Sequence, residues 1–213
     1  MAICRDGSVV GRGGNDPRSH AERLPLEAMA LLSDHGLSLQ DVDLFVVVCG
    51  PGSFTGLRVG VSAVQGWAFA TGRSVAAVPT LDALANAAAP VASGEVLVTC
   101  LDGLRGEVFY SAWRDGTELL AASVGSAAEV IHCVQAVAGS APVCVVGDGV
   151  PKYAAVWAAA GWREQPTLIT LAESAVVLVN AGRFSSGVPH AARPLYVRRT
   201  DAEIVRERAG RPS

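Results

Sequence analysis

The order of predicted strands and helices repeats along the chain, and this repeat constrains the fold more than any other feature. The second half predicts the order βββαβαβα. The first half predicts ββαβαβα, which is the same order without the leading strand. Strands that alternate with helices favour sheets covered by helices. We therefore expect a duplicated α/β protein with two mixed sheets, divided into residues 1–92 and 93–213.

Local signals place the elements of the first unit. The Asp6-Gly7 pair predicts a tight turn between two short strands. Ser19 and Glu22 form a capping box that predicts the start of a helix, and Pro25, beyond its first turn, should kink this helix or delay its start. The other expected elements are a strand at 43–49, a helix at 53–71, a strand at 74–79 and a helix at 80–89.

Turn signals also delimit the second unit. The pairs Asp102-Gly103 and Asp115-Gly116 predict the turns that join its first three strands. The expected elements are strands at 95–101, 107–113 and 118–124, a helix at 126–137, a strand at 142–147, a helix at 151–160, a strand at 167–169 and a helix at 171–183.

The charge balance gives the chain no overall attraction to nucleic acid. It carries 17 basic and 20 acidic residues, for a formal net charge of −3, whereas nucleic-acid-binding domains usually present a basic face. The C-terminal end is the exception and holds six arginines: Arg193, Arg198, Arg199, Arg206, Arg208 and Arg211. Such a run is most often a solvated terminus, and contact with a partner or an RNA phosphate is the alternative.

Composition narrows the class of protein further. Half of the residues are hydrophobic, yet no apolar run reaches the roughly 18 residues of a membrane helix, and the start lacks the features of a signal peptide. The five cysteines include no C-x-x-C pair, and the four histidines form neither H-x-x-x-H nor H-E-x-x-H. These features predict a cytoplasmic protein with free thiols, no membrane segment and no metal site of the zinc-protease type.

Residues 43–60, DLFVVVCGPGSFTGLRVG, join a predicted buried strand to a predicted helix through a Gly-Pro-Gly turn. Many proteins hold a phosphate in this way. A Walker A loop would need Gly-Lys-Ser/Thr, which is absent, and a G-x-S-x-G nucleophile elbow would need glycine where Pro51 stands. The sequence therefore favours a turn in which Gly50 and Gly52 adopt unusual backbone angles and Ser53 caps the helix.

The helix after this turn carries two patterns. An apolar seam follows a/d spacing through Phe54, Leu57, Val61, Val64 and Ala68. Gly56 and Gly60 lie four residues apart on another part of its surface, although glycine inside a helix costs about 1 kcal/mol against alanine. The glycines indicate close approach by a neighbouring helix, which belongs either to the same domain or to a partner.

The motif GPGSFTGLRVG, with its preceding strand and the following SAVQGWAFATG, closely resembles the TsaB (YeaZ) family. Other stretches agree in order: HAERL, LDGLRGEVFYSAW, VVGDG and RPLYVRRTDAE. These are bacterial partner proteins in the synthesis of N6-threonylcarbamoyladenosine on tRNA, and older names place them with the M22 glycoproteases. The resemblance covers nearly the whole chain and implies two tandem actin-like (ribonuclease H-like) domains.

The resemblance also implies a function without independent catalysis. Family members support a larger catalytic paralogue, TsaD, with a TsaE-like ATPase as third component, and meet tRNA only through the complex. A homodimer in isolation and a nucleotide at a shared interface are further expectations, with no cofactor bound by this chain alone. The first two helices of domain one would dock the partner, through Leu24, Ala28, Leu31, Phe54, Gly56, Leu57, Gly60, Val61 and Val64.

The sequence departs from the family pattern at its start. Family members open with a strand that ends in Asp-Thr-Ser, ahead of the stretch that matches MAICRDG, and the repeat lacks a strand at the same place. Either the start codon has been assigned too late, or the first sheet is incomplete. We expect residues 1–5 and 43–49 to be unpaired on their facing sides or to lie near 10 Å apart.

Two weaker candidates for a phosphate site lie in the second unit. Asp102-Gly103 occupies the place of a phosphate-facing acidic turn in actin-like ATPases, although a plain hairpin turn explains it as well. Gly147 and Gly149 flank an Asp between a strand and a helix, where either a nucleotide or a simple turn would fit. A nucleotide-hydrolysing or sugar-kinase-like enzyme and an M22-type peptidase are thus the competing functions, and we expect the isolated chain to show neither activity.

Overall fold

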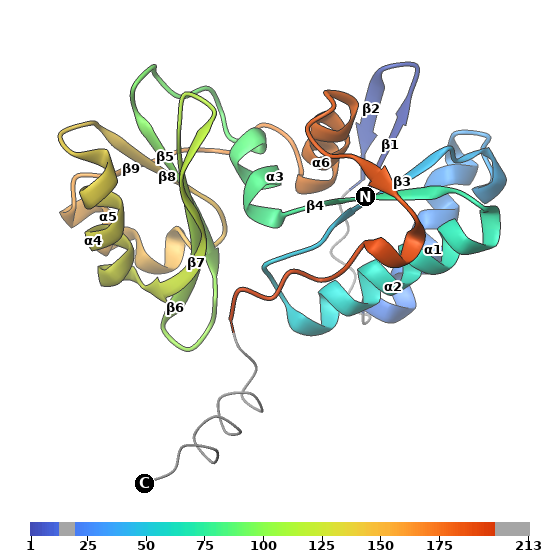
Figure 1. The fold of residues 1–213 in the computed structure, drawn as a ribbon, viewed down its shortest axis with the longest axis horizontal. Helices are drawn as coiled ribbons and strands as arrows, with labels where there is room; N and C mark the ends of the chain where they lie inside the picture. The colour runs from blue at the N-terminus through green and yellow to red at the C-terminus, as the bar shows by residue number, and fades with distance from the viewer. Residues whose placement is uncertain (13–19, 199–213) are drawn as a thin grey trace, which may run out of the picture.

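A computed structural model describes residues 1–12 and 20–198 of the chain, without the side chains of residues 20–22 (Figure 1). In this part of the chain the strands form a hairpin, a three-stranded sheet and a five-stranded sheet. The first half contains β1 (Ala2–Arg5), β2 (Ser8–Gly11), α1 (His20–Asp34), η1 (Leu39–Asp41), β3 (Leu44–Val48), α2 (Phe54–Thr71), β4 (Ser74–Val78) and α3 (Thr80–Ala87). The second half contains β5 (Val96–Asp102), β6 (Glu107–Arg114), β7 (Thr117–Ser126), α4 (Ala127–Ala138), β8 (Val143–Val146), η2 (Pro151–Tyr153), α5 (Ala154–Ala159), β9 (Arg163–Glu164), α6 (Leu171–Asn180), β10 (Ser186–Gly187) and η3 (Pro189–Ala191).

The two larger sheets are mixed, as predicted. The five-stranded sheet has the order β7-β6-β5-β8-β9, in which β5 runs antiparallel to β6 and parallel to β8. The three-stranded sheet has the order β10-β4-β3, in which β4 runs parallel to β3 and antiparallel to β10. Helices pack against these sheets (Figure 1), which confirms the predicted α/β class.

The central strand of the larger sheet, β5, is buried on both faces. Val98 packs in one cluster with Val130 of α4 and Trp157 of α5. Leu97 packs in another cluster with Leu84 of α3. Successive side chains of a strand point to opposite faces, so a strand covered on both sides reads as the continuous apolar run found in the sequence.

The hairpin of β1 and β2 is closed by Asp6 and Gly7, whose φ angles of 51° and 80° fit the predicted two-residue turn. In the repeat, β1 corresponds to β6 and β3 corresponds to β8. Strands β6 and β8 flank β5 in the five-stranded sheet. No described strand lies between β1 and β3, and these two strands do not pair with each other. The prediction that these two strands are unpaired on their facing sides is therefore confirmed for the described residues. The hairpin packs instead on α6, where Asn180 Nδ2 donates a hydrogen bond to Cys4 Sγ at 3.2 Å.

The end of the described chain returns to the first half. Helix α6 packs on α3 and β3, and Ser186 in β10 pairs with Ala76 in β4. Figure 1 shows this return, with α6 and β10 beside the first-half strands. The division at residues 1–92 and 93–213 stays a prediction, and by packing the returning segment belongs with the first half.

Several predicted details are wrong or lie outside the described residues. The strand expected at 167–169 is replaced by β9 at Arg163–Glu164, and Thr167 makes only an isolated bridge with Ala88. The capping box of Ser19 lies outside the described residues. Pro25 does not delay the start of α1, because the helix already begins at His20. No helix in the described part of the chain is long and apolar enough to span a bilayer.

Candidate functional site

The Gly-Pro-Gly turn between β3 and α2 is closed by contacts within the chain. The backbone N–H of Thr80 donates to the carbonyl oxygen of Gly50, and that of Leu195 donates to the carbonyl oxygen of Cys49, both at 2.7 Å. Gly50 has a φ of 121°, and a Cβ there would lie 2.5 Å from the carbonyl oxygen of Leu195. Close approach by residues 193–198, which we call the strap, therefore accounts for this glycine.

The two other residues singled out in the turn behave differently. Ser53 Oγ accepts a hydrogen bond from the N–H of Gly56 at 3.3 Å and so caps α2. Gly52 is not among the glycines with positive φ, and a Cβ there would lie 4.0 Å from the side chain of Leu57, in ordinary contact. The expectation of unusual backbone angles thus holds for Gly50 and is wrong for Gly52.

The apolar seam of α2 faces the core of its own domain. Val61 and Val64 are buried in one cluster with Phe45 of β3, and Leu31 of α1 is buried as well. These side chains are covered within the chain, so the a/d seam marks the face that packs on the sheet. Their place at a partner interface stays a prediction.

Phe54 and Leu57 also face their own chain. Leu57 is partly buried beneath the turn, and its Cδ1 lies 3.0 Å from the position of a Cβ on Gly50. The ring of Phe54 lies 5.3 Å from that of Tyr196 in the strap. The N-terminal turn of α2 is thus a contact for the strap.

The other predicted interface residues lie at the surface where α1 packs on α2. Leu24, Ala28, Gly56 and Gly60 are partly exposed. A depression of about 220 Å³ lies between the helices and is lined by Arg23, Leu24, Glu27, Gly56, Val59 and Gly60. A Cβ added to Gly60 would meet no described atom of the chain within 4 Å. Packing within the described chain therefore does not require this glycine.

The acidic turn after β5 is held by internal contacts. Lys152 Nζ donates to both carboxylate oxygens of Asp102, at 2.8 and 3.0 Å, and this hydrogen bonding lowers the pKa of Asp102. The N–H of Leu104 also donates to Asp102 Oδ1 at 2.9 Å. The connection is longer than the two-residue turn expected from Asp102-Gly103, because β6 begins only at Glu107.

The glycines near this turn allow close backbone approach. A Cβ on Gly147 would collide with the carbonyl oxygen of Cys100, and one on Gly149 would lie 2.8 Å from Cys100 Sγ. A Cβ on Gly103 would lie 2.9 Å from the carbonyl oxygen of Glu107. Packing explains all three glycines, and a nucleotide at a shared interface stays a prediction. Among the described residues no three His, Cys, Asp or Glu side chains gather as metal ligands would.

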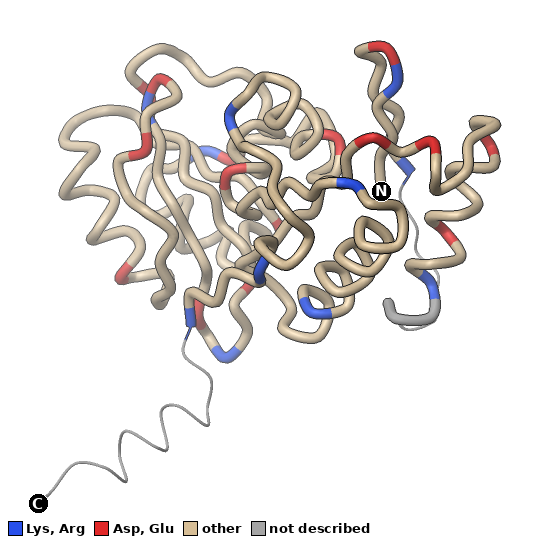
Figure 2. The backbone as a smooth tube through the Cα atoms, turned by 45° about the vertical axis from the view of Figure 1, so that its right-hand side comes forward, with Lys and Arg blue, Asp and Glu red and all other residues tan. Residues whose placement is uncertain are grey.

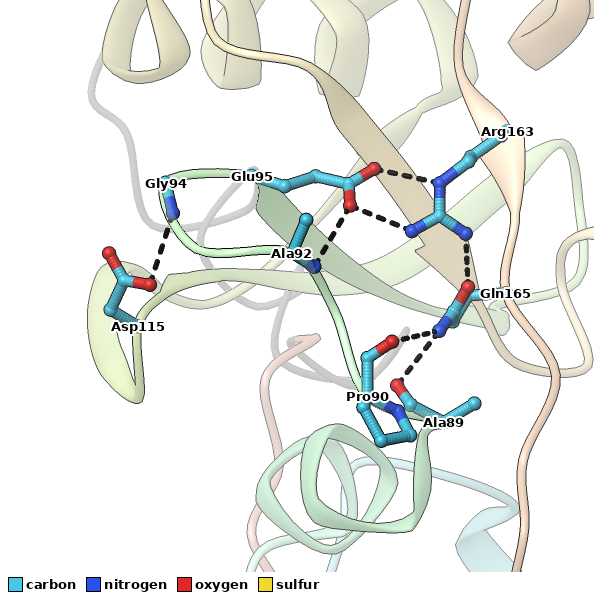
Figure 3. Close-up of polar contacts among 8 residues, drawn as sticks. All are labelled: Ala89, Pro90, Ala92, Gly94, Glu95, Asp115, Arg163 and Gln165. Carbon is cyan, nitrogen blue, oxygen red and sulfur yellow. Dashed lines mark hydrogen bonds and ion pairs between the residues drawn. The ribbon is translucent and has the colours of Figure 1, made fainter.

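A clasp that the sequence patterns did not indicate joins the linker before β5 to β9 (Figure 3). Arg163 donates from Nε and Nη2 to the two carboxylate oxygens of Glu95, at 2.8 and 2.7 Å. Its third nitrogen donates to Gln165, whose amide donates in turn to the carbonyl oxygens of Ala89 and Pro90. Hydrogen bonds from Arg163 lower the pKa of Glu95. Glu95 was expected only as the first residue of a strand.

A cavity of about 350 Å³ lies beside this clasp, between α3, the β6–β7 turn and the residues after α6. Asp82, Trp113 and Arg183 are among its lining residues. Burial, followed by the charge of Glu118, raises the pKa of Asp82 to about 6, while Arg183 opposes this shift.

Comparison with known proteins agrees with the resemblance seen in the sequence. The model of the family TsaD: tRNA N6-adenosine threonylcarbamoyltransferase matches residues 13–154. An uncharacterised protein of Mycobacterium tuberculosis is 35% identical over 188 residues, which cover 88% of this chain and 79% of that protein. The tRNA threonylcarbamoyladenosine biosynthesis protein TsaB of Escherichia coli is 30% identical over 114 residues, which cover 54% of this chain and 49% of that protein.

A solved structure also resembles the whole described fold. It is an uncharacterised protein of Pseudomonas aeruginosa with similarity to peptidase YeaZ, with a TM-score of 0.72, 26% identity, and coverage of 92% of this chain and 93% of that chain. The predicted actin-like arrangement is confirmed by this likeness. The chain therefore belongs to the family described by the TsaD model, as a homologue of its TsaB (YeaZ) members.

Proposed function

We propose that the chain is a subunit of the complex that makes N6-threonylcarbamoyladenosine on tRNA. Three of its relatives, from Haemophilus influenzae, Escherichia coli and Bacillus subtilis, are named tRNA threonylcarbamoyladenosine biosynthesis protein TsaB. Within this complex the chain acts as a non-catalytic partner of a TsaD-like paralogue. A TsaE-like ATPase as third component and a homodimer of the isolated chain are part of the same proposal.

The α1–α2 surface carries this proposal. Gly60 leaves open space above α2 in the described chain, so a helix of a second protein can approach the backbone there. The neighbouring depression offers the apolar side chains of Leu24 and Val59 for its contacts.

Replacing Gly60 by leucine tests the docking surface. The new side chain would fill the space reserved for the partner, and overpacking at a well-fitted contact typically costs 1–3 kcal/mol. We expect Gly60→Leu to weaken binding to the TsaD-like paralogue at least about fivefold in titration calorimetry. The isolated chain should keep or raise its melting temperature, because leucine favours a helix over glycine by about 0.5–1 kcal/mol.

Gly66→Leu is the matched control. Gly66 lies on α2 with no described atom within 4 Å of an added Cβ, and six residues place it about 120° around the helix from Gly60. We expect this variant to bind the paralogue within about twofold of the wild type. Unchanged affinity of the Gly60→Leu variant would place the docking surface elsewhere.

A further inference from the structure

An aromatic and arginine cluster forms where the strap crosses the start of α2. The guanidinium carbon of Arg58 lies 4.0 Å from the ring centroid of Phe54. Arg58 Nε donates to the hydroxyl oxygen of Tyr196 at 3.0 Å. Phe54 and Tyr196 are each 44% exposed, and Arg58 is exposed as well. Two accessible rings and a planar cation are thus held together at the surface by contacts between distant segments.

The strap carries further positive charge away from this cluster. Arg193 is exposed at its start, and Arg198 at its end pairs with Glu107 and lies 5.2 Å over the ring of Phe109. Figure 2 shows basic segments along the lower edge of the molecule, near the point where the described chain ends. Arg198 and Glu107 neutralise each other, so the positive charge of this edge comes from Arg58 and Arg193.

This combination of groups fits unpaired RNA. Bases of single-stranded segments stack on aromatic rings and on guanidinium planes, and arginine binds phosphate through charge-assisted hydrogen bonds. We propose that the edge formed by Phe54, Arg58, Arg193 and Tyr196 binds tRNA directly, with an unpaired nucleotide at the two rings and phosphates at the two arginines. This inference rests on the proposed function, since tRNA is the substrate of that complex.

The charge of the edge favours RNA over a protein partner. The α1–α2 depression is lined by small and apolar residues, and its charges, Arg23 and Glu27, pair with each other at 2.9 Å. The strap edge instead exposes Arg58 against two aromatic rings, and Arg193 is exposed three residues before Tyr196. The two surfaces therefore have different chemistry, and each suits a different component of the complex.

The test is the affinity of the full-length chain for a fluorescently labelled, unmodified tRNA transcript, measured by anisotropy at several salt concentrations. Arg58→Glu should weaken binding about tenfold and lower the slope of log K against log salt by about one, as expected for a lost phosphate contact. Arg5→Glu is the matched control, because Arg5 is exposed at the far hairpin and carries the same charge change. It should change affinity less than about twofold.

A second pair of variants separates base stacking from anchoring of the strap. Tyr196→Ala removes the ring and should weaken tRNA binding at least about fivefold. Tyr196→Phe keeps the ring, loses only the hydrogen bond from Arg58, and should bind nearly as the wild type does. A thermal unfolding scan of each variant must show that the fold is retained.

Three results would overturn the inference. Equal losses for Arg58→Glu and Arg5→Glu would mean non-specific attraction. Equal losses for the two Tyr196 variants would mean that the hydroxyl group, through its hydrogen bond from Arg58, accounts for the effect and that the ring does not stack on a base. Weaker binding of Arg58→Glu to the TsaD-like paralogue, with unchanged affinity for tRNA, would assign the edge to a protein contact. Failure of the proposed docking surface would appear instead in the Gly60→Leu titration and would leave this measurement unaffected.

Discussion

Replacing Arg163 by methionine should destabilise the chain, because Glu95 would keep its buried position and lose its charged partner. The carboxylate of Glu95 is only 6% exposed, and two hydrogen bonds from Arg163 satisfy it at 2.8 and 2.7 Å. The other described contacts are with the N–H of Ala92, at a long 3.4 Å, and with the side chain of Cys144. The variant would therefore bury a carboxylate with little compensation.

The exposure of Arg163 limits the size of this effect. Removing one partner of a fully buried ion pair costs about 3–5 kcal/mol, but the side chain of Arg163 is 49% exposed, and water screens pairs of this kind. We expect a loss of about 2 kcal/mol in the free energy of unfolding at pH 7. For a chain of this size such a loss lowers the melting temperature by roughly 4–8 °C.

The stability difference between the wild type and Arg163→Met should also depend on pH. Hydrogen bonds from Arg163 lower the folded-state pKa of Glu95, so the contribution of the pair is present above the unfolded pKa of about 4.3 and is lost as the pH falls through the folded value. The difference between wild type and Arg163→Met should therefore shrink below about pH 4.

Urea unfolding followed by circular dichroism measures these differences. Glu95→Gln combined with Arg163→Met is the control, because it leaves no buried charge and should recover part of the loss. An Arg163→Met variant within about 0.5 kcal/mol of the wild type at pH 7 would refute the reasoning.

Two further predictions concern single positions. Gly147→Ala should lower the free energy of unfolding by at least about 2 kcal/mol, because φ is 125° and the added Cβ would collide with the carbonyl oxygen of Cys100. Gly139→Ala, at a φ of 62° with no described atom near, should lose less, and equal losses in urea unfolding would contradict the clash. Asp82→Asn should raise stability at pH 8 and not near pH 4, because burial raises the folded pKa of Asp82 to about 6, and above that pH the wild type must carry a partly buried charge that lowers its stability. A difference that does not vary with pH would show that Asp82 does not titrate in this range.

Local signals predicted most elements of the fold. The Asp6-Gly7 turn and the cap at Ser53 depend on neighbours a few residues away, and each lies where its motif indicates. The lack of pairing between β1 and β3 could be predicted because the second unit supplies a template, in which β5 separates β6 from β8.

Features that depend on distant contacts could not be predicted in this way. The seam through Val61 and Val64 has the same spacing whether it faces a partner or its own sheet, and only tertiary packing decides between them. Gly50 is explained by Leu195, which is remote in sequence. The return of α6 and β10 to the first half and the ion pair of Glu95 with Arg163 likewise leave no periodic signal.

The most direct test of the account is reconstitution of the tRNA modification. The TsaD-like paralogue and the remaining components are incubated with tRNA, threonine, bicarbonate and ATP, with or without this chain, and the digested nucleosides are measured by mass spectrometry. We predict that N6-threonylcarbamoyladenosine accumulates only when this chain is added, and that the Gly60→Leu variant supports less of it than Gly66→Leu. Equal accumulation without the chain would contradict its role as a required subunit, and formation by the chain in the absence of the paralogue would contradict its non-catalytic role.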